Sequence, residues 1–189
     1  MRRSLAIAAA ASALSALVGC GSSTPPASAP SPEASPAASA APDATPDPAA
    51  SPGAAVPGVP PLTGNPTDVT KASQAKAGAG QPPTKLVTQD VVVGKGTVAT
   101  LADTVNVRYS GTLYSNGTLF DSSWSSGDAP VSFPLNGVVP GFAQGIAGMQ
   151  PGGRRVIVIP PALGYGDQTN GPIPGGSTLV FVVDLVGVS

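Results

Sequence analysis

Two tyrosines, a phenylalanine and an aspartate gather in one short stretch of the chain, VRYSGTLYSNGTLFDSS, at residues 107–123. The usual catalytic side chains are otherwise scarce, because the chain has no histidine and Cys20 is its one cysteine. A nucleophile paired with histidine cannot be built from this composition, and neither can the nitrogen and sulfur ligand sets of zinc or copper. The chemistry that remains is that of an apolar, aromatic surface with a carboxylate and phenolic hydroxyls.

The elements that must position these side chains follow from the spacing of apolar residues. The alternating stretch TVNVRYSGTLY predicts a strand, and Asn116-Gly117 predicts a two-residue type I′ hairpin turn after it. In an ideal hairpin of this type Phe120 shares the face of Tyr109, whereas Asp121 points away. For Asp121 to reach that face, the second strand would have to bulge or bend just after Phe120.

One segment departs from the β pattern. Phe142, Ile146 and Met149 are spaced as i, i+4 and i+7, which predicts a short helix that starts near Pro140 and ends by Gly152-Gly153. The fold class that we predict is therefore α+β, an antiparallel twisted β-sheet wrapped around one short α-helix. Further β-branched runs predict strands at 90–96, 154–160 and 177–188, and the last run is apolar enough to lie centrally in the sheet.

The first residues of the chain have the pattern of an export signal. A basic start is followed by a short apolar run and by LVGC, which ends at Cys20. This order is similar to that of bacterial lipoproteins and implies a signal peptide at 1–19, cleavage before Cys20 and acylation of its sulfur. We then expect an extracytoplasmic protein anchored to a bacterial membrane, at the periplasmic face or the cell surface. The alternative is an ordinary secretory signal with an incidental cysteine.

The segment that follows, 20–84, is rich in proline, alanine and serine, and 15 of the 23 prolines precede Lys85. Such a composition has too few large apolar residues to offset the entropy of ordering. We therefore expect a disordered N-terminal region at 20–84 that tethers a folded domain at 85–189. A net charge of −1 gives no electrostatic case for nucleic acid binding.

Four stretches of the expected domain resemble, in the same order, the FKBP-type peptidyl-prolyl isomerases: VRYSGTL, GTLFDSS, VVPGFAQGIAGMQPGGRRVIVIPPALGYG and IPGGSTLVFVVDLVGV. The resemblance covers about Val87 to Val188. It implies an FKBP-like fold and an enzyme that rotates X–Pro bonds in proline-containing, exported polypeptides without cofactor or metal. It also implies inhibition by tacrolimus-type macrolides, and we expect a monomer.

The same resemblance implies the residues of a proline pocket. Two features depart from the family pattern: the loop SSWSSGDAP at 122–130 has no arginine to pair with the carboxylate of Asp121, and Val131 replaces an aromatic residue at the pocket rim. These departures leave open a module that binds proline peptides without turnover, or a surface interaction protein on a tether. The resemblance implies Tyr109, Phe120, Asp121, Phe142, Tyr165 and Phe181 as catalytic residues, and Val131, Val138, Val139 and Ile173 as substrate-binding residues, with the Val139 N–H receiving a ligand carbonyl. Because the resemblance places Asp121 in the pocket, we expect the strand to bulge or bend just after Phe120.

Overall fold

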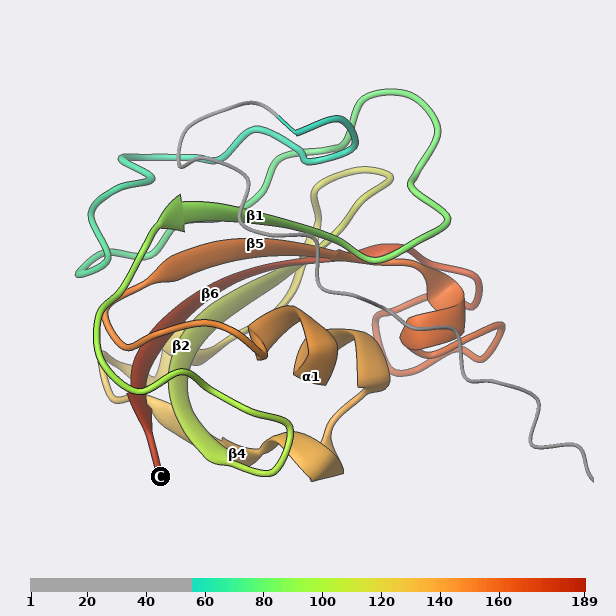
Figure 1. The fold of residues 1–189 in the computed structure, drawn as a ribbon. Helices are drawn as coiled ribbons and strands as arrows, with labels where there is room; N and C mark the ends of the chain where they lie inside the picture. The colour runs from blue at the N-terminus through green and yellow to red at the C-terminus, as the bar shows by residue number, and fades with distance from the viewer. Residues whose placement is uncertain (1–55) are drawn as a thin grey trace, which may run out of the picture. The chain divides into compact units, whose positions relative to one another are not determined.

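The computed structural model describes residues 56–189, which contain one antiparallel sheet of six strands (Figure 1). The strand order is β1-β5-β6-β2-β3, and β4 pairs with the first part of β2. The predicted fold class is confirmed. The strands are β1 (Val87–Val92), β2 (Thr104–Leu113), β3 (Leu119–Ser122), β4 (Val131–Pro134), β5 (Arg154–Ile159) and β6 (Leu179–Val188), and the helices are α1 (Pro140–Ile146) with the 3-10 turns η1 (Ser123–Ser126), η2 (Leu135–Gly137) and η3 (Pro161–Leu163).

The last strand, β6, lies between β5 and β2, as its apolar sequence predicts. Alternate side chains of a strand point to opposite faces of a sheet, so an unbroken apolar run indicates burial on both faces. Both faces of β6 are indeed covered, because Phe181 and Val183 pack with α1 in one core, whereas Val180 and Val182 pack in a second core on the opposite face.

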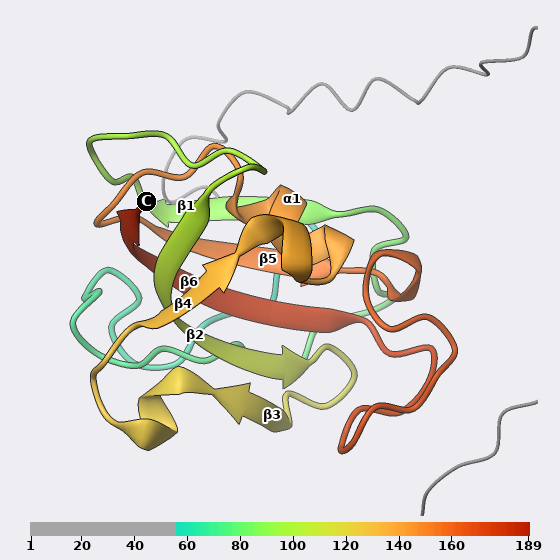
Figure 2. The same cartoon turned by 90° about the horizontal axis from the view of Figure 1, so that it is seen from below.

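The helix α1 covers the first of these faces (Figures 1 and 2). It begins at Pro140, and Phe142 and Ile146 are buried, as expected from their spacing. The helix ends at Ile146, shortly before Gly148, whose φ is +85°. This end is earlier than the one predicted at Gly152-Gly153. A Cβ on Gly145 would lie 2.4 Å from Cγ2 of Ile157, so this glycine permits the close approach of helix and sheet.

The connection between β2 and β3 is longer than the two-residue turn predicted at Asn116-Gly117. The Leu113 N–H donates to the Thr118 carbonyl (2.9 Å), and the Gly117 N–H donates to the Leu113 carbonyl (2.8 Å), so residues 114–117 form the loop. The prediction of a type I′ turn is wrong. The reason is that Asn116 Oδ1 accepts the Thr118 N–H (2.9 Å) that would otherwise pair across a two-residue turn.

The strap, residues 56–84, differs from the disordered tether expected at these positions. It belongs to the same compact unit as the sheet and crosses the sheet face opposite to α1 (Figure 1). Its Ala75 is buried at 3% exposure, and Val59 and Leu62 pack on the second core of the sheet. The strap therefore covers the apolar side chains Val156, Val158, Val180 and Val182.

The composition did not predict this packing, because the strap is held by few large side chains and by many hydrogen bonds of its backbone. The predicted signal peptide at 1–19, Cys20 and the tether up to residue 55 lie outside the described residues. Within residues 56–189, no helix has the length and apolar character needed to cross a membrane.

The strap also closes over an ion pair inside the protein. Arg154 is fully buried and Asp184 is 4% exposed; Nη2 of Arg154 donates to Oδ2 of Asp184 (2.7 Å), and Nε donates to Oδ1. The guanidinium also donates to the carbonyls of Pro66 (3.1 Å) and Lys71 (2.8 Å) in the strap. Burial raises the pKa of Asp184, and the guanidinium opposes that rise. Each nitrogen of this buried guanidinium thus donates to Asp184 or to a carbonyl of the strap.

Candidate active site

Four aromatic rings from different elements form one cluster between the sheet and α1. Phe142 of α1 lies 5.0 Å from Phe181 of β6 and 6.2 Å from Tyr109 of β2, measured between ring centroids. Phe120 of β3 lies 5.6 Å from Phe181 in a T-shaped arrangement. Edge-to-face contacts of this kind hold rings in fixed orientations. The structure therefore brings together four of the six residues expected to be catalytic.

The carboxylate of Asp121 joins this cluster through the hydroxyl of Tyr109. The hydroxyl donates to Oδ2 of Asp121 at 2.6 Å. Burial, and then the bond to the carboxylate, raise the pKa of Tyr109, so the hydroxyl stays protonated as a donor. No ion pair of Asp121 occurs within residues 56–189, in agreement with the missing arginine of the loop. The Tyr109 hydroxyl thus fixes the orientation of the Asp121 carboxylate.

A bulge in β3 makes this bond possible, as expected. Thr112 pairs with Leu119 and Gly111 pairs with Asp121, so Phe120 is the extra residue between two regular pairs. At a bulge two consecutive side chains can turn toward one side of the sheet. The consequence is seen at the pocket, where the side chains of both Phe120 and Asp121 line the same cavity.

Two serines fasten the chain just after the bulge. Ser123 is buried, and its Oγ accepts the Tyr109 N–H at 2.9 Å. The Ser122 hydroxyl donates to the Tyr109 carbonyl (3.2 Å) and accepts the Trp124 N–H (3.3 Å), which caps η1. These bonds connect the end of β3 to the backbone of Tyr109. They explain why serines follow Asp121, a role that the sequence did not reveal.

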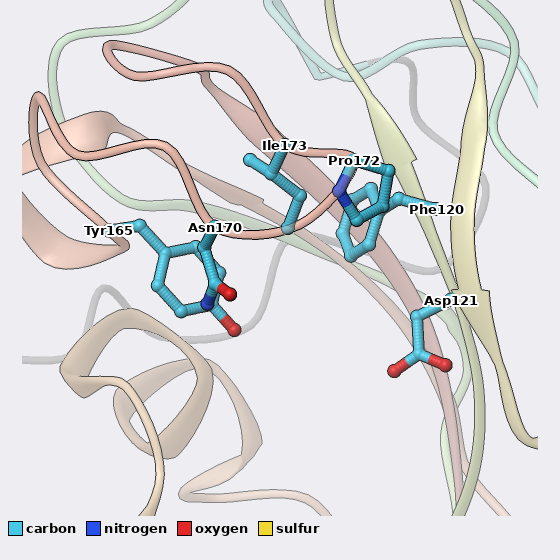
Figure 3. A pocket seen from close by; sticks show the side chains of 6 residues that line it. All are labelled: Phe120, Asp121, Tyr165, Asn170, Pro172 and Ile173. Carbon is cyan, nitrogen blue, oxygen red and sulfur yellow. The ribbon is translucent and has the colours of Figure 1, made fainter.

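A cavity of about 200 Å³ opens beside the cluster (Figure 3). Phe120 and Asp121 form one side of it, and the loop after η3 forms the other side with Tyr165 and Ile173. Ile173 is 4% exposed and Tyr165 is half-buried. The remaining expected catalytic residue, Tyr165, therefore faces Asp121 across the cavity, together with Ile173, which was expected to bind substrate.

The other three residues expected to bind substrate lie on β4 and at the start of α1. Val139 immediately precedes α1, and its carbonyl accepts the N–H groups of the first helical turn. Among residues 56–189, none accepts a hydrogen bond from the Val139 N–H, which leaves this donor for a ligand. Val138 is half-buried against the core that contains the aromatic cluster. Val131 is 37% exposed at the start of β4 and does not line the cavity.

Several residues of the site escaped the sequence reasoning. Phe133, which is on β4 two residues after Val131, lies 5.9 Å from the ring of Tyr109 and 6.2 Å from that of Phe142. Strand alternation places positions 131 and 133 on one face, and this signal could have identified Phe133. Further residues missed are Asn170 and Pro172, which line the cavity, and Gly111, whose missing side chain leaves room for the rings of Phe120 and Phe181.

The arrangement favours chemistry without proton transfer. It provides apolar ring faces, one carboxylate with a fixed orientation and an unpaired backbone N–H, and residues 56–189 contain no cluster of side chains suited to a metal ion. We expect kcat/KM of this site to change less than about twofold between about pH 6 and about pH 9, because histidine is the side chain that ordinarily titrates there and the chain has none. A pH series of the reaction rate checks this, and a bell-shaped profile contradicts it.

The comparisons with known proteins agree with this geometry. The family model described as FKBP-type peptidyl-prolyl cis-trans isomerase matches residues 95–186. The probable FK506-binding protein of Corynebacterium glutamicum is 42% identical over 113 residues, which are 60% of this chain and 95% of that protein.

Solved structures show the same likeness. The crystal structure of FkpA from Escherichia coli matches with a TM-score of 0.53 and 46% identity, over 56% of this chain and 49% of that one. The crystal structure of AtFKBP13 matches with a TM-score of 0.52 and 36% identity, over 57% of this chain and 95% of that one. With its aromatic cluster, its Tyr109–Asp121 pair and these relatives, the chain belongs to the FKBP-type peptidyl-prolyl cis-trans isomerase family.

Proposed function

We propose that the aromatic cluster and the cavity beside it isomerise X–Pro bonds in proline-containing polypeptides outside the cytoplasm. The observation that carries the proposal is the convergence of rings from β2, β3, β6 and α1 next to a carboxylate that a neighbouring hydroxyl orients. The family supports the isomerase activity. The signal pattern at 1–19 supports a location outside the cytoplasm, where the substrates would be exported polypeptides.

The reaction requires rotation and no bond cleavage. The barrier of an X–Pro bond is about 18–20 kcal/mol and arises from amide resonance, so the uncatalysed exchange takes tens to hundreds of seconds. The twisted amide of the transition state has lost that resonance and with it part of the charge separation of the planar form. A pocket that replaces water with ring faces favours the twisted form over the planar one.

The residues of the site have separate tasks in this scheme. We expect the pyrrolidine ring to rest on Phe142 and Phe181, whose rings lie 5.0 Å apart in the cluster beside the cavity, with Phe120 as a wall of the cavity. The Val139 N–H holds a carbonyl of the substrate next to the proline. The remaining groups are Asp121, whose negative charge favours the rotated dipole of the amide, and Tyr165 and Ile173, which close the opposite side.

A refolding assay tests this function. The full chain should accelerate the slow refolding phase of a protein limited by a trans-to-cis X–Pro step, and a tacrolimus-type macrolide should remove the acceleration. A chain that binds proline peptides but leaves the slow phase unchanged would contradict catalysis and support a binding module. Phe142→Leu serves as the matched variant, because it keeps an apolar side chain of similar size but removes the ring.

The Tyr109–Asp121 bond gives a sharper test. We expect Asp121→Ala and Tyr109→Phe each to lower kcat/KM by about tenfold, since a hydrogen bond to a charged group is worth roughly 1.5–3 kcal/mol. Because Tyr109 acts through the carboxylate of Asp121, the double variant should be barely worse than Asp121→Ala alone. Steady-state rates of the four proteins check this. Losses that multiply in the double variant would show that the two groups act independently.

The lipid anchor is a separate proposal that rests on the LVGC motif ending at Cys20. An acylated Cys20 would hold the enzyme at a membrane surface, because each buried CH₂ of an acyl chain adds about 0.8 kcal/mol of membrane affinity. The test compares the full chain with Cys20→Ser after expression in a bacterium fed labelled palmitate. We expect the full chain to carry the label and to appear in the membrane fraction, and we expect neither for Cys20→Ser. If both proteins distribute equally between the membrane and soluble fractions, the acylation of Cys20 is contradicted and residues 1–19 are an ordinary secretory signal.

A further inference from the structure

Tyr114, in the loop between β2 and β3, connects three segments that are distant in the sequence. It is 3% exposed. Its carbonyl accepts the Gly78 N–H (2.8 Å), its N–H donates to the Thr178 carbonyl (3.0 Å), and its hydroxyl donates to the Ala79 carbonyl (3.2 Å). The ring lies flat on Gly78, since a Cβ there would be 2.1 Å from Cζ of Tyr114. The strap therefore holds this loop by its ring and its backbone together.

The strap also holds β2 beyond the bulge. The Ser110 hydroxyl donates to the Ser73 carbonyl, and Ser110 pairs with Ser122 at the end of β3. The bulged residue Phe120 lies between this pair and the loop that contains Tyr114. The strap thus contacts β2 at Ser110 on one side of the irregularity and the loop at Tyr114 on the other side.

This placement matters because β3 is short and lies at an edge of the sheet. It has one neighbour, β2, and a two-stranded ribbon is marginally stable by itself in water. A bulge removes a regular pair from the ladder. β2 is paired with β6 along its length, and Ser122 and Ser123 connect the end of β3 to Tyr109. The side of the bulge that still needs support is therefore the loop between β2 and β3. Thr178, the third partner of Tyr114, ends the loop that carries Tyr165 and Ile173.

We propose that the strap acts as an intramolecular clasp for the active site, with Tyr114 as the positioning residue that transmits its hold to Phe120 and Asp121. The strap then contributes to catalysis, because it contacts the loop of the hairpin whose bulge shapes the pocket. This inference rests on the proposed isomerase function for one of its two readouts.

The experiment compares variants of the full chain at a temperature at which circular dichroism shows all of them folded. Tyr114→Ala removes the ring, and Gly78→Val places a branched side chain where the ring lies. Tyr114→Phe is the conservative variant, which loses only the bond to the Ala79 carbonyl. Val158→Ala is the matched control: Val158 is buried under the strap on β5, two strands away from β2, so it lowers stability without touching the loop.

Two measurements are made on each protein. The first is amide hydrogen exchange at Leu113, whose N–H closes the hairpin on Thr118, and at Tyr109, whose N–H is held by Ser123, with Ala147 of the helix end as the internal reference. The second is kcat and KM for prolyl isomerisation. Exchange is independent of activity, so it tests the clasp even in a protein without turnover.

We expect Tyr114→Ala and Gly78→Val to speed exchange at Leu113 and Tyr109 by about tenfold or more relative to Ala147, and to lower kcat/KM by about tenfold. Tyr114→Phe should restore both values to within about threefold of wild type. Val158→Ala should change neither, despite a lower melting temperature.

The clasp is refuted if Tyr114→Ala melts at a lower temperature but keeps wild-type kcat/KM and wild-type exchange at Leu113 and Tyr109, as Val158→Ala does. If Tyr114→Ala does not fold, the same exchange and rate measurements on Gly78→Val and Ser110→Ala test the contacts of the strap on the two sides of the bulge. A wild-type chain without isomerase activity would refute the proposed function, whereas the exchange pattern would still decide on the clasp.

Discussion

Arg154→Ala should lower the free energy of unfolding by about 3–5 kcal/mol, because removal of one partner leaves the other charge buried and uncompensated. The ion pair with Asp184 is almost wholly inaccessible to water. The change also leaves the carbonyls of Pro66 and Lys71 without their donors. For a domain of this size we expect the melting temperature to fall by about 10 to 20 °C, measured by circular dichroism with denaturant titration as a second method.

The pH dependence of this loss has a definite sign. Burial raises the pKa of Asp184 in the folded protein, and the loss of Arg154 raises it further. A carboxyl with a raised folded pKa favours the folded state below its unfolded pKa, and this contribution is lost as the pH rises through the folded value. The loss of unfolding free energy caused by Arg154→Ala should therefore be smallest below about pH 4 and should grow toward neutral pH.

Two controls separate the buried pair from charge in general. Lys71→Ala removes an exposed ion pair with Asp68, in which the Lys71 side chain is 79% accessible, and it should cost less than about 1 kcal/mol. In the double variant Arg154→Met/Asp184→Leu no charge stays buried, so much of the lost stability should return. A double variant no more stable than Arg154→Ala would show that the strap carbonyls, and not the ion pair, dominate the loss.

Gly111→Ala should lower kcat/KM by about tenfold to a hundredfold with a much smaller effect on stability. A Cβ at this position would lie 2.7 Å from Cε2 and Cζ of Phe120 and 2.9 Å from Cε1 of Phe181. Phe181 is buried, whereas Phe120 is half-buried at the cavity wall. The ring that can move is therefore that of Phe120, and the open space beside it is the cavity itself. The added methyl group narrows the site while the core stays packed.

The measurements are the isomerisation rate and the melting temperature of the same preparations. Gly137→Ala is the matched control, because a Cβ there meets only Cγ of Pro134 at 3.4 Å, and it should leave kcat/KM within about twofold of wild type. A second variant, Gly111→Ala with Phe120→Ala, removes the clash together with the wall. Wild-type kcat/KM in Gly111→Ala would mean that Phe120 does not form a wall that substrate must pass.

The sequence by itself determined the elements in which residues near in the chain decide the structure. The run from Ser177 onward predicted a central strand, and the spacing of Phe142 and Ile146 predicted the helix. The bulge in β3 was predicted because the family resemblance implied that Asp121 lies in the pocket. Four stretches in the family's order placed the rings of the cluster. The strand and the helix could be predicted because hydrophobic periodicity acts over a few residues, whereas the residues of the ring cluster were implied by the family resemblance.

Tertiary structure alone decided the strap, the loop between β2 and β3, and the part that Phe133 and Gly111 play in the site. The partners of Arg154 and Tyr114 in the strap are backbone carbonyls and a glycine, and they lie 35 or more positions away in the chain. Every residue has a backbone carbonyl, so the residue types at Pro66, Lys71 and Ala79 do not indicate that their carbonyls accept hydrogen bonds from buried side chains. A segment that composition assigns to disorder can therefore be ordered by a sheet that offers it buried donors, and that outcome depends on the fold as a whole.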